Sequence, residues 1–161
     1  MSAIILIDTS VYLNVLDVSG FNQDRKTVLQ DFSTFIQSNS HFLLPLATIW
    51  ETGNHIAHLS SGSSRRTFAI KLVTDIGNAL NGNSPYRPTH FPDREEFLGW
   101  LRDFPEYAKR NKSDDKPNEG TSLADLSIIK EWERTCSKNP MSRVCIWSLD
   151  QDLSGYDQNP G

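Results

Sequence analysis

The sequence predicts an α/β protein in which helices cover both faces of a central, mostly parallel sheet. Two apolar segments, residues 4–7 and 144–147, contain no alternating polar residues, as is typical of strands that are buried on both faces. Segments with helical spacing of apolar residues lie between them, so strands and helices alternate along the chain. Alternation of this kind favours parallel strands joined by right-handed crossovers, and we therefore expect a three-layer α/β/α domain.

Turn residues and apolar periodicity divide the first half of the chain into strands and helices. Ser10 is suited to cap a helix directly after the first strand. Apolar residues from Val28 to Ile36 recur at helical spacing and predict a second helix with one buried face. After the first strand we expect helices at 10–16 and 25–37, a strand at 41–45, and helices at 47–59 and 65–80.

Prolines make residues 85–120 harder to assign, because each one interrupts regular hydrogen bonding. Five prolines fall in this region: Pro85, Pro88, Pro92, Pro105 and Pro117. Residues 112–120 are charged and lack apolar periodicity, which predicts a loop. We expect a further strand within 84–92, one or two helices within 93–109, a helix at 122–136 and a last strand at 144–147.

Length and composition favour a single cytoplasmic domain. A chain of 161 residues has the size of one domain, and we expect residues 1–161 to form it, with an extended helical and loop insertion at about 60–120. No apolar segment approaches the ~20 residues needed to span a bilayer, and no basic leader precedes the first strand. Cys136 and Cys145 are too few for a disulfide framework and lack the spacing of a zinc site, so we expect core thiols.

The net charge of −4 argues at first against a nucleic-acid partner, but its distribution does not. Ten of the 16 Lys and Arg residues lie within 60–116. Local rather than total charge steers a polyanion, so this region is the candidate RNA contact, with a solvated loop as the alternative for 109–116. The candidate contact residues are Arg65, Arg66, Lys109, Arg110 and Lys112.

Four acidic residues stand where a reaction could use them. Asp8 and Asp150 follow the first and last strands, and parallel strands would bring them to the same edge of the sheet. Glu51 lies in the helix after the second strand, and Asp125 lies at the start of the helix after the central loop. Each acid alone has a structural explanation: Asp8 as a helix cap, Glu51 and Asp125 as first-turn acids, and Asp150 as a turn residue.

The set of four favours a metal site over these separate explanations. Clustered carboxylates repel one another unless a cation or a proton is shared among them. All-oxygen ligation by Asp and Glu selects Mg²⁺ or Mn²⁺, and such an ion activates water for attack on a phosphodiester.

The order of the motifs resembles that of PIN-domain ribonucleases along essentially the whole chain. Residues 7–11 (Ile-Asp-Thr-Ser-Val) resemble the opening motif of the family, and Leu44-Pro45 followed by Glu51 resembles its helix acid. Residues 120–129 resemble the third motif closely, and residues 148–153 resemble the final Thr-x-Asp-x-Asp-Phe, with Ser for Thr and Leu for Phe.

The resemblance implies a PIN-like fold and Mg²⁺- or Mn²⁺-dependent cleavage of RNA. Asp8, Glu51, Asp125 and Asp150 would be the catalytic, metal-binding acids. Ser10 and Ser148 would orient carboxylates, and Asp152 would have an outer or second-metal role. The single-domain architecture is most similar to that of VapC-like toxin ribonucleases, which dimerise and are silenced by an antitoxin, although this chain is longer than a compact toxin.

Other classes fit the residues less well. A non-catalytic PIN-like module that binds RNA or protein has no need of four repelling carboxylates. A phosphatase of the haloacid-dehalogenase type needs a second Asp where Ser10 stands, and a phosphoryl receiver needs a Lys just after the last strand. His55 and His58 lie on one side of a helix with Glu51, but their spacing differs from that of helical zinc motifs. We expect the four tryptophans, Trp50, Trp100, Trp132 and Trp147, to be core residues rather than base-stacking platforms.

Overall fold

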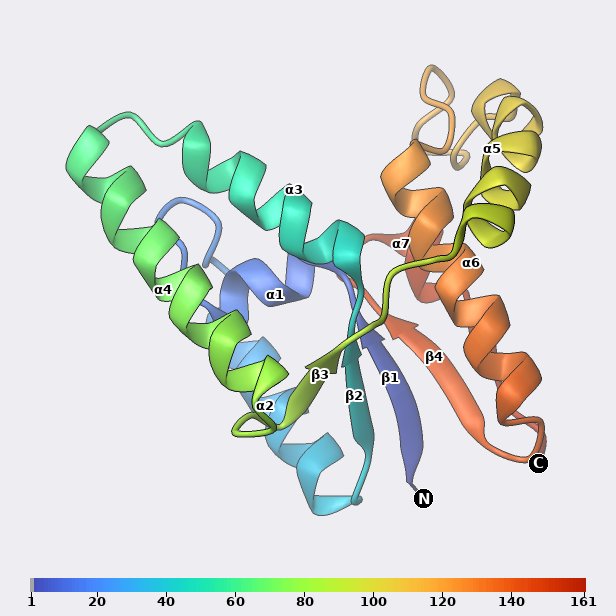
Figure 1. Ribbon diagram of the computed structural model, residues 1–161, viewed down its shortest axis with the longest axis horizontal. Helices are drawn as coiled ribbons and strands as arrows, with labels where there is room; N and C mark the ends of the chain where they lie inside the picture. The colour runs from blue at the N-terminus through green and yellow to red at the C-terminus, as the bar shows by residue number, and fades with distance from the viewer. Residues whose placement is uncertain (1) are drawn as a thin grey trace.

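A five-stranded sheet with the strand order β3-β2-β1-β4-β5 forms the centre of the computed structural model, which describes residues 2–161 (Figure 1). Four strands are parallel, and the edge strand β5 pairs antiparallel with β4. The strands are β1 (Ala3–Ile7), β2 (His41–Leu44), β3 (Tyr86–Pro88), β4 (Arg143–Trp147) and β5 (Asp157–Gln158).

The apolar residues of β1 alternate between two separate cores, one on each face of the sheet. Ile5 and Ile7 pack in the larger core, and Leu6 packs in the smaller one. All three side chains are fully buried, which explains why the sequence of β1 shows no polar alternation. β1 therefore ends inside the molecule, and the residue that follows it is held in a fixed place.

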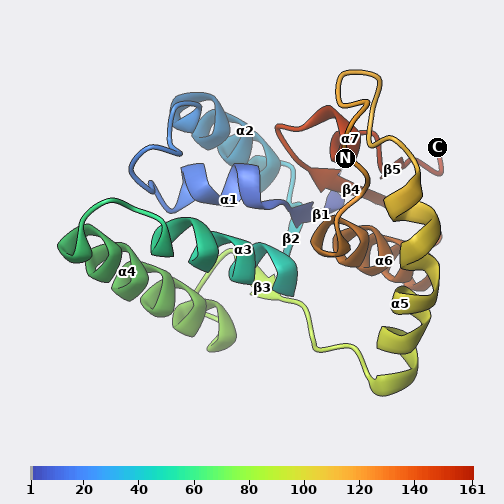
Figure 2. The same cartoon turned by 90° about the horizontal axis from the view of Figure 1, so that it is seen from above.

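Helices α1 (Thr9–Val15), α2 (Arg25–Gln37) and α4 (Gly62–Leu80) contribute to the larger core, while α6 (Leu123–Lys138) contributes to the smaller one. Helix α5 (Arg94–Lys109) packs on α6, and the short α7 (Gln151–Ser154) follows β4. Helix α3 (Leu46–Ala57) contacts both α1 and α6, so it connects the two helical layers near the carboxyl ends of the strands (Figure 2).

The expected fold class is confirmed. The strand expected within 84–92 is β3, and the one or two helices expected within 93–109 are a single helix that contains Pro105. The sequence patterns missed α7 and β5, which are too short to show a period. None of the helices in residues 2–161 combines the length and the apolar character needed to cross a bilayer.

The expectation that all four tryptophans are core residues is wrong for Trp50, which is exposed, and for Trp100, which is half-buried and belongs to neither core. Trp147 is 9% exposed, but Trp50 is 64% exposed. Thr48, Thr52 and Ile56 form the buried face of α3, and Trp50 lies on the opposite face because it is two residues away from Thr48 along the helix.

Candidate metal centre

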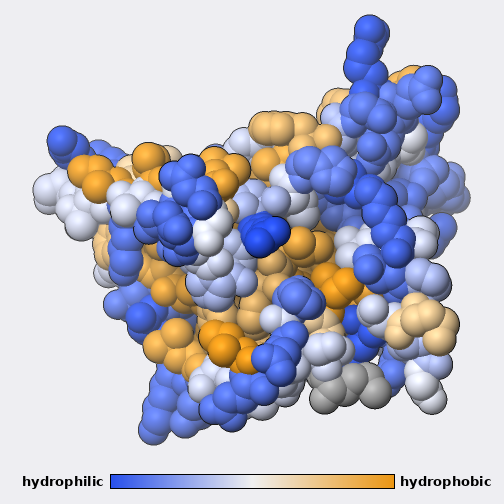
Figure 3. Space-filling view, turned by 60° about the horizontal axis from the view of Figure 1, so that its bottom comes forward, coloured by the Kyte–Doolittle hydropathy of each residue, from blue (hydrophilic) through white to orange (hydrophobic). Residues whose placement is uncertain are grey.

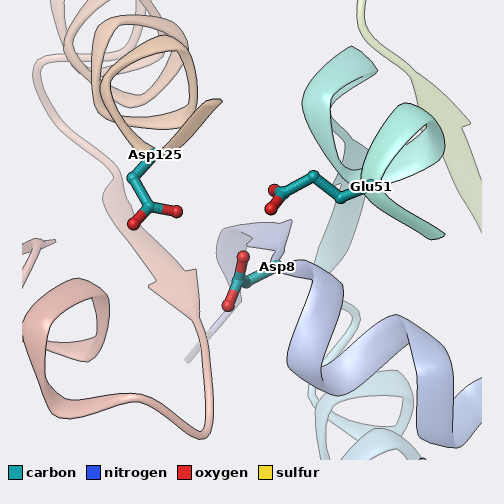
Figure 4. A group of neighbouring side chains, drawn as sticks. All are labelled: Asp8, Glu51 and Asp125. Carbon is teal, nitrogen blue, oxygen red and sulfur yellow. The ribbon is translucent and has the colours of Figure 1, made fainter. Parts of the chain in front are cut away.

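Three carboxylates converge beyond the carboxyl ends of the parallel strands. Asp8 follows β1, Glu51 lies on α3 and Asp125 lies on α6, and all three point toward a common space (Figure 4). One oxygen of each lies within 4.8 Å of the others. These residues are 43 and 74 positions apart in the sequence, so the fold of the sheet brings them together.

Asp8 is held by two serine hydroxyls. It stands at the N-cap position of α1, but its side chain makes no capping hydrogen bond. Its Oδ2 instead accepts hydrogen bonds from Ser148 Oγ at 2.7 Å and from Ser10 Oγ at 3.0 Å. Burial raises the pKa of Asp8, and the charge of Asp125 adds to this effect, while the serine hydrogen bonds oppose it. Helix capping therefore does not account for this carboxylate.

Glu51 faces the site from the second turn of α3, so the first-turn explanation is wrong. Thr9 Oγ1 donates a hydrogen bond to Glu51 Oε1 at 3.1 Å. The start of α3 is attached to the end of β1 because Thr48 Oγ1 donates to the carbonyl oxygen of Ile7 at 2.8 Å. Burial, together with the charge of Asp125, raises the pKa of Glu51 to about 7. An ordinary surface glutamate would not show this shift.

Asp125 faces a lysine from the central loop. The Asp125 amide donates to Ser122 Oγ at 3.0 Å, which fixes the first turn of α6. Lys112 Nζ lies 2.7 Å from Asp125 Oδ2 and 3.2 Å from Asp152 Oδ2. Lys116 Nζ lies 3.4 Å from Asp152 Oδ1. Burial alone would lower the pKa of Lys112, but its contacts with Asp125 and Asp152 raise it above the ordinary value.

The loop that carries Lys112 is folded back against α5. The Lys112 amide donates to the Glu119 carbonyl oxygen at 2.6 Å, which closes the loop on itself. The Thr121 amide donates to the Tyr107 carbonyl oxygen at 3.2 Å. A Cβ placed on Gly120 would lie 2.1 Å from the carbonyl oxygen of Ala108, so the chain approaches α5 closely at this glycine.

Comparison with known proteins supports the fold alone. No family profile and no curated protein sequence matches the chain. FitAcB from Neisseria gonorrhoeae aligns over 94% of this chain and 91% of its own, with a TM-score of 0.55 and 18% identity. A structure of FitAB bound to an IR36 DNA fragment aligns over 94% of this chain and 89% of its own, with a TM-score of 0.56 and 17% identity. The fold is PIN-like.

Within this PIN-like domain, Asp150 and Asp152 take different places from the converging acids. Asp150 is exposed and stands at the N-cap position of α7. It lines a cavity of about 520 Å³ together with Asp8, Glu51 and Asp125, but it is not one of the three acids whose oxygens converge. The side chain of Asp152 is only 8% exposed and pairs with Lys112 and Lys116. Asp152 is therefore linked to Asp125 by Lys112, which contacts both carboxylates.

The other candidate residues are dispersed over the PIN-like domain. Arg65 and Arg66 lie on α4, where Arg65 Nη1 donates to the Leu59 carbonyl oxygen at 2.5 Å. Lys109 ends α5 and Arg110 follows it, on the other side of the molecule in Figure 1. Of the five basic candidates, Lys112 alone lines the acidic cavity.

The two histidines are not among the converging ligands. His55 lines the cavity but packs on Phe21, with the ring centroids 4.7 Å apart, and burial lowers its pKa. His58 Nδ1 lies 2.7 Å from the Asn54 carbonyl oxygen. Sequence reasoning named neither the Thr9 contact with Glu51 nor the Lys112 contact with Asp125. Thr9 lies inside the first motif, whereas Lys112 was expected only as an RNA contact and nothing in the charged loop indicated its pairing with Asp125.

Proposed function

We propose that this chain is a Mg²⁺- or Mn²⁺-dependent endoribonuclease and the toxin of a toxin–antitoxin pair. The observation that supports the proposal most strongly is the convergence of Asp8, Glu51 and Asp125, with oxygens within 4.8 Å of one another. Carboxylates this close repel one another unless a cation or a proton is shared among them, and a divalent cation can be held by all three. The likeness to the FitAB structures supports the choice of a toxin with a protein partner.

The donor set fits a hard divalent cation. Carboxylate oxygens are the ligands that Mg²⁺ and Mn²⁺ prefer, and the position of Lys112 shows that the acids already accept a positive charge. Asp8, Glu51 and Asp125 would hold the ion, with Asp150 close enough to the cavity to contribute. When bound, the ion would supply a Lewis acid for the scissile phosphate and lower the pKa of a water molecule.

The remaining groups of the site position the acids and the substrate. Ser10 and Ser148 hold Asp8 Oδ2, which leaves Oδ1 of Asp8 free of these serines. Thr9 holds Glu51 Oε1. Lys112 carries a positive charge at the edge of the acids, where it can contact a phosphate oxygen once it leaves Asp125.

The test is cleavage of structured and unstructured RNAs by the purified protein with Mn²⁺ and with EDTA. We expect cleavage with Mn²⁺ only, and its loss in Asp8→Asn and Asp125→Asn. Asp31→Asn, an exposed acid on α2, is the matched control and should cut like the wild type. Cleavage that survives EDTA or Asp8→Asn would overturn the mechanism, and RNA binding without cleavage would indicate the non-catalytic module.

A second readout is independent of activity. A metal that binds the native state raises the melting temperature, so Mn²⁺ should stabilise the wild type and Asp31→Asn but not Asp125→Asn. An equal shift in Asp125→Asn would place the ion elsewhere.

The toxin part of the proposal has a separate test in cells. Expression of the wild type should arrest growth, whereas Asp8→Asn should not, and co-expression of a small protein encoded next to the chain should restore growth. Normal growth with the wild type at full expression would contradict this part and leave the nuclease assay unaffected.

A further inference from the structure

A second hollow begins where the acidic cavity ends. It is a groove of about 560 Å³ between α3, α5 and α6, closed by the connection from β3 to α5, which Figure 2 shows running between these helices. Glu51 lines both the groove and the acidic cavity, so the two spaces are neighbours. A ligand that passes through the metal centre would reach the groove directly.

The walls of the groove are aromatic. Trp50, Phe91 and Phe97 line it and are 64%, 71% and 45% exposed. No other Phe, Trp or Tyr side chain in residues 2–161 is as exposed as these three. The face shown in Figure 3 carries separate apolar patches between hydrophilic side chains. Flat aromatic surfaces that remain open to solvent are suited to stack on planar ligands.

The groove also contains a buried carboxyl group with one unused oxygen. Glu131 lines the groove from α6, and its side chain is 2% exposed. Its Oε1 accepts a hydrogen bond from Thr89 Oγ1 at 2.7 Å and lies 3.6 Å from Arg134 Nη2. Its Oε2 is buried without a hydrogen-bond partner. Buried acceptors are nearly always paired, so this oxygen lacks a donor that a ligand in the groove could supply.

We propose that this groove is a nucleobase subsite for single-stranded RNA next to the scissile phosphate. The inference rests on the proposed nuclease function. A base stacks on Trp50 and its aromatic neighbours, and its amino group donates to Glu131 Oε2. Single-stranded bases are recognised in this way, by stacking and by hydrogen bonds to their edges. Arg94 lines the groove as well and supplies a cation for the attached phosphate.

The chemistry of Glu131 selects among the bases. Cytosine and adenine offer an exocyclic amino group, and a carboxylate accepts from such a group. Uracil offers only its ring N–H, which lies between two carbonyl oxygens that a carboxylate repels. The subsite therefore prefers an amino-bearing base and discriminates against uracil.

The test measures binding without cleavage. Fluorescein-labelled hexamers of cytidine, adenosine and uridine are titrated with the protein in EDTA at a pH above about 7, where the Glu131 carboxyl is ionised, and fluorescence anisotropy gives each dissociation constant. We expect the wild type to bind the cytidine and adenosine hexamers at least about 5-fold more tightly than the uridine hexamer. This ratio needs no substitution, so it does not depend on the folding of any variant.

Two substitutions separate stacking from base selection. Trp50→Ala should weaken binding of all three hexamers by about 5- to 100-fold, and Trp50→Phe should restore most of it. Glu131→Gln should remove the preference against uridine. Val73→Ala, a 71% exposed apolar residue on α4, is the control and should bind like the wild type.

The outcomes distinguish this proposal from the proposed function. Equal affinity for the three hexamers, or unchanged binding by Trp50→Ala, would overturn the subsite even if RNA is cleaved. Loss of a protein partner in Trp50→Ala with unchanged RNA binding would also overturn it and assign the groove to that protein. If the protein cleaves no RNA but Glu131→Gln abolishes the preference for cytidine and adenosine over uridine, the subsite is supported and the nuclease proposal fails.

Discussion

Ser148 donates a 2.7 Å hydrogen bond to Asp8 Oδ2 although 140 positions separate the two residues. The contact forms because β4 and β1 are parallel neighbours that end at the same edge. Groups that orient a metal ligand typically change metal affinity by about 10- to 100-fold. We expect Ser148→Ala to weaken Mn²⁺ binding by about this factor in calorimetric titration. Ser154→Ala, an exposed serine of α7, should bind Mn²⁺ like the wild type.

Replacing Lys112 with Met should have opposite effects on stability and on metal binding. Without metal, Asp125 and Asp152 lose their counter-ion, so the unfolding free energy in urea should fall by about 2 kcal/mol at low salt. With metal, the ammonium no longer competes for Asp125, so the dissociation constant for Mn²⁺ should decrease. Lys26→Met makes the same charge change on the exposed side of α2 and should do neither. Weaker Mn²⁺ binding in Lys112→Met would show that the lysine supports the ion instead.

Gly120→Ala should displace the loop that holds Lys112. The added Cβ would lie 2.1 Å from the Ala108 carbonyl oxygen, and backbone must move to make room. We expect a loss of about 1–3 kcal/mol in unfolding free energy. Gly99→Ala is the matched control, because nothing lies within 4 Å of its Cβ and the position is inside α5. That variant should gain about 0.5–1 kcal/mol, since alanine favours a helix more than glycine does.

The stability of the metal-free protein should decrease as the pH rises from 5 to 8. Burial raises the pKa of Glu131 from its ordinary value of 4.5 to about 7. The folded state therefore binds this proton more tightly than the unfolded chain, and the resulting stability is present below pH 4.5 and lost as the pH rises through 7. The loss from this group is at most about 3 kcal/mol.

Urea unfolding in EDTA at several pH values measures this dependence, and Glu131→Gln should flatten it. Glu95→Gln, an exposed acid of α5, should retain the slope of the wild type. The residual slope of Glu131→Gln should have the same sign, because burial raises the pKa of Glu51 in the same direction. A wild-type stability that increases from pH 5 to 8 would contradict the assignment of a buried, protonated Glu131.

Sequence periodicity was sufficient to predict the fold and the residues that follow its central strands. β1 and β4 have uninterrupted apolar sequences because both of their faces are covered, and parallel strands necessarily present their carboxyl ends together. The same rule predicts that residues following β1 and β4 share one edge of the sheet. Asp8 and Ser148 do so and are in contact.

The features that the sequence did not reveal depend on tertiary contacts between side chains, which no sequence pattern indicates. Lys112 was expected to contact RNA, but its loop has the charges of any solvated segment and does not indicate the contact with Asp125. Trp50 has apolar neighbours in the sequence, but the face of α3 on which it lies is open. Glu131 lies on a helix with mixed charges, and its burial follows from the packing of α5 and the 89–93 connection against α6.

The central place of β1 in the sheet also sets when the site can form during synthesis. β1 is made before β4, one of its two neighbours in the sheet, and the helices α1 to α6 separate the two strands along the chain. Until residues 143–147 emerge, one edge of β1 has no partner and Asp8 has no Ser148. A nascent chain that lacks β4 therefore carries a strand with one unpaired edge, and its Asp8 lacks the hydrogen bond from Ser148. The topology delays the full hydrogen bonding of Asp8 until β4 and Ser148 have been made.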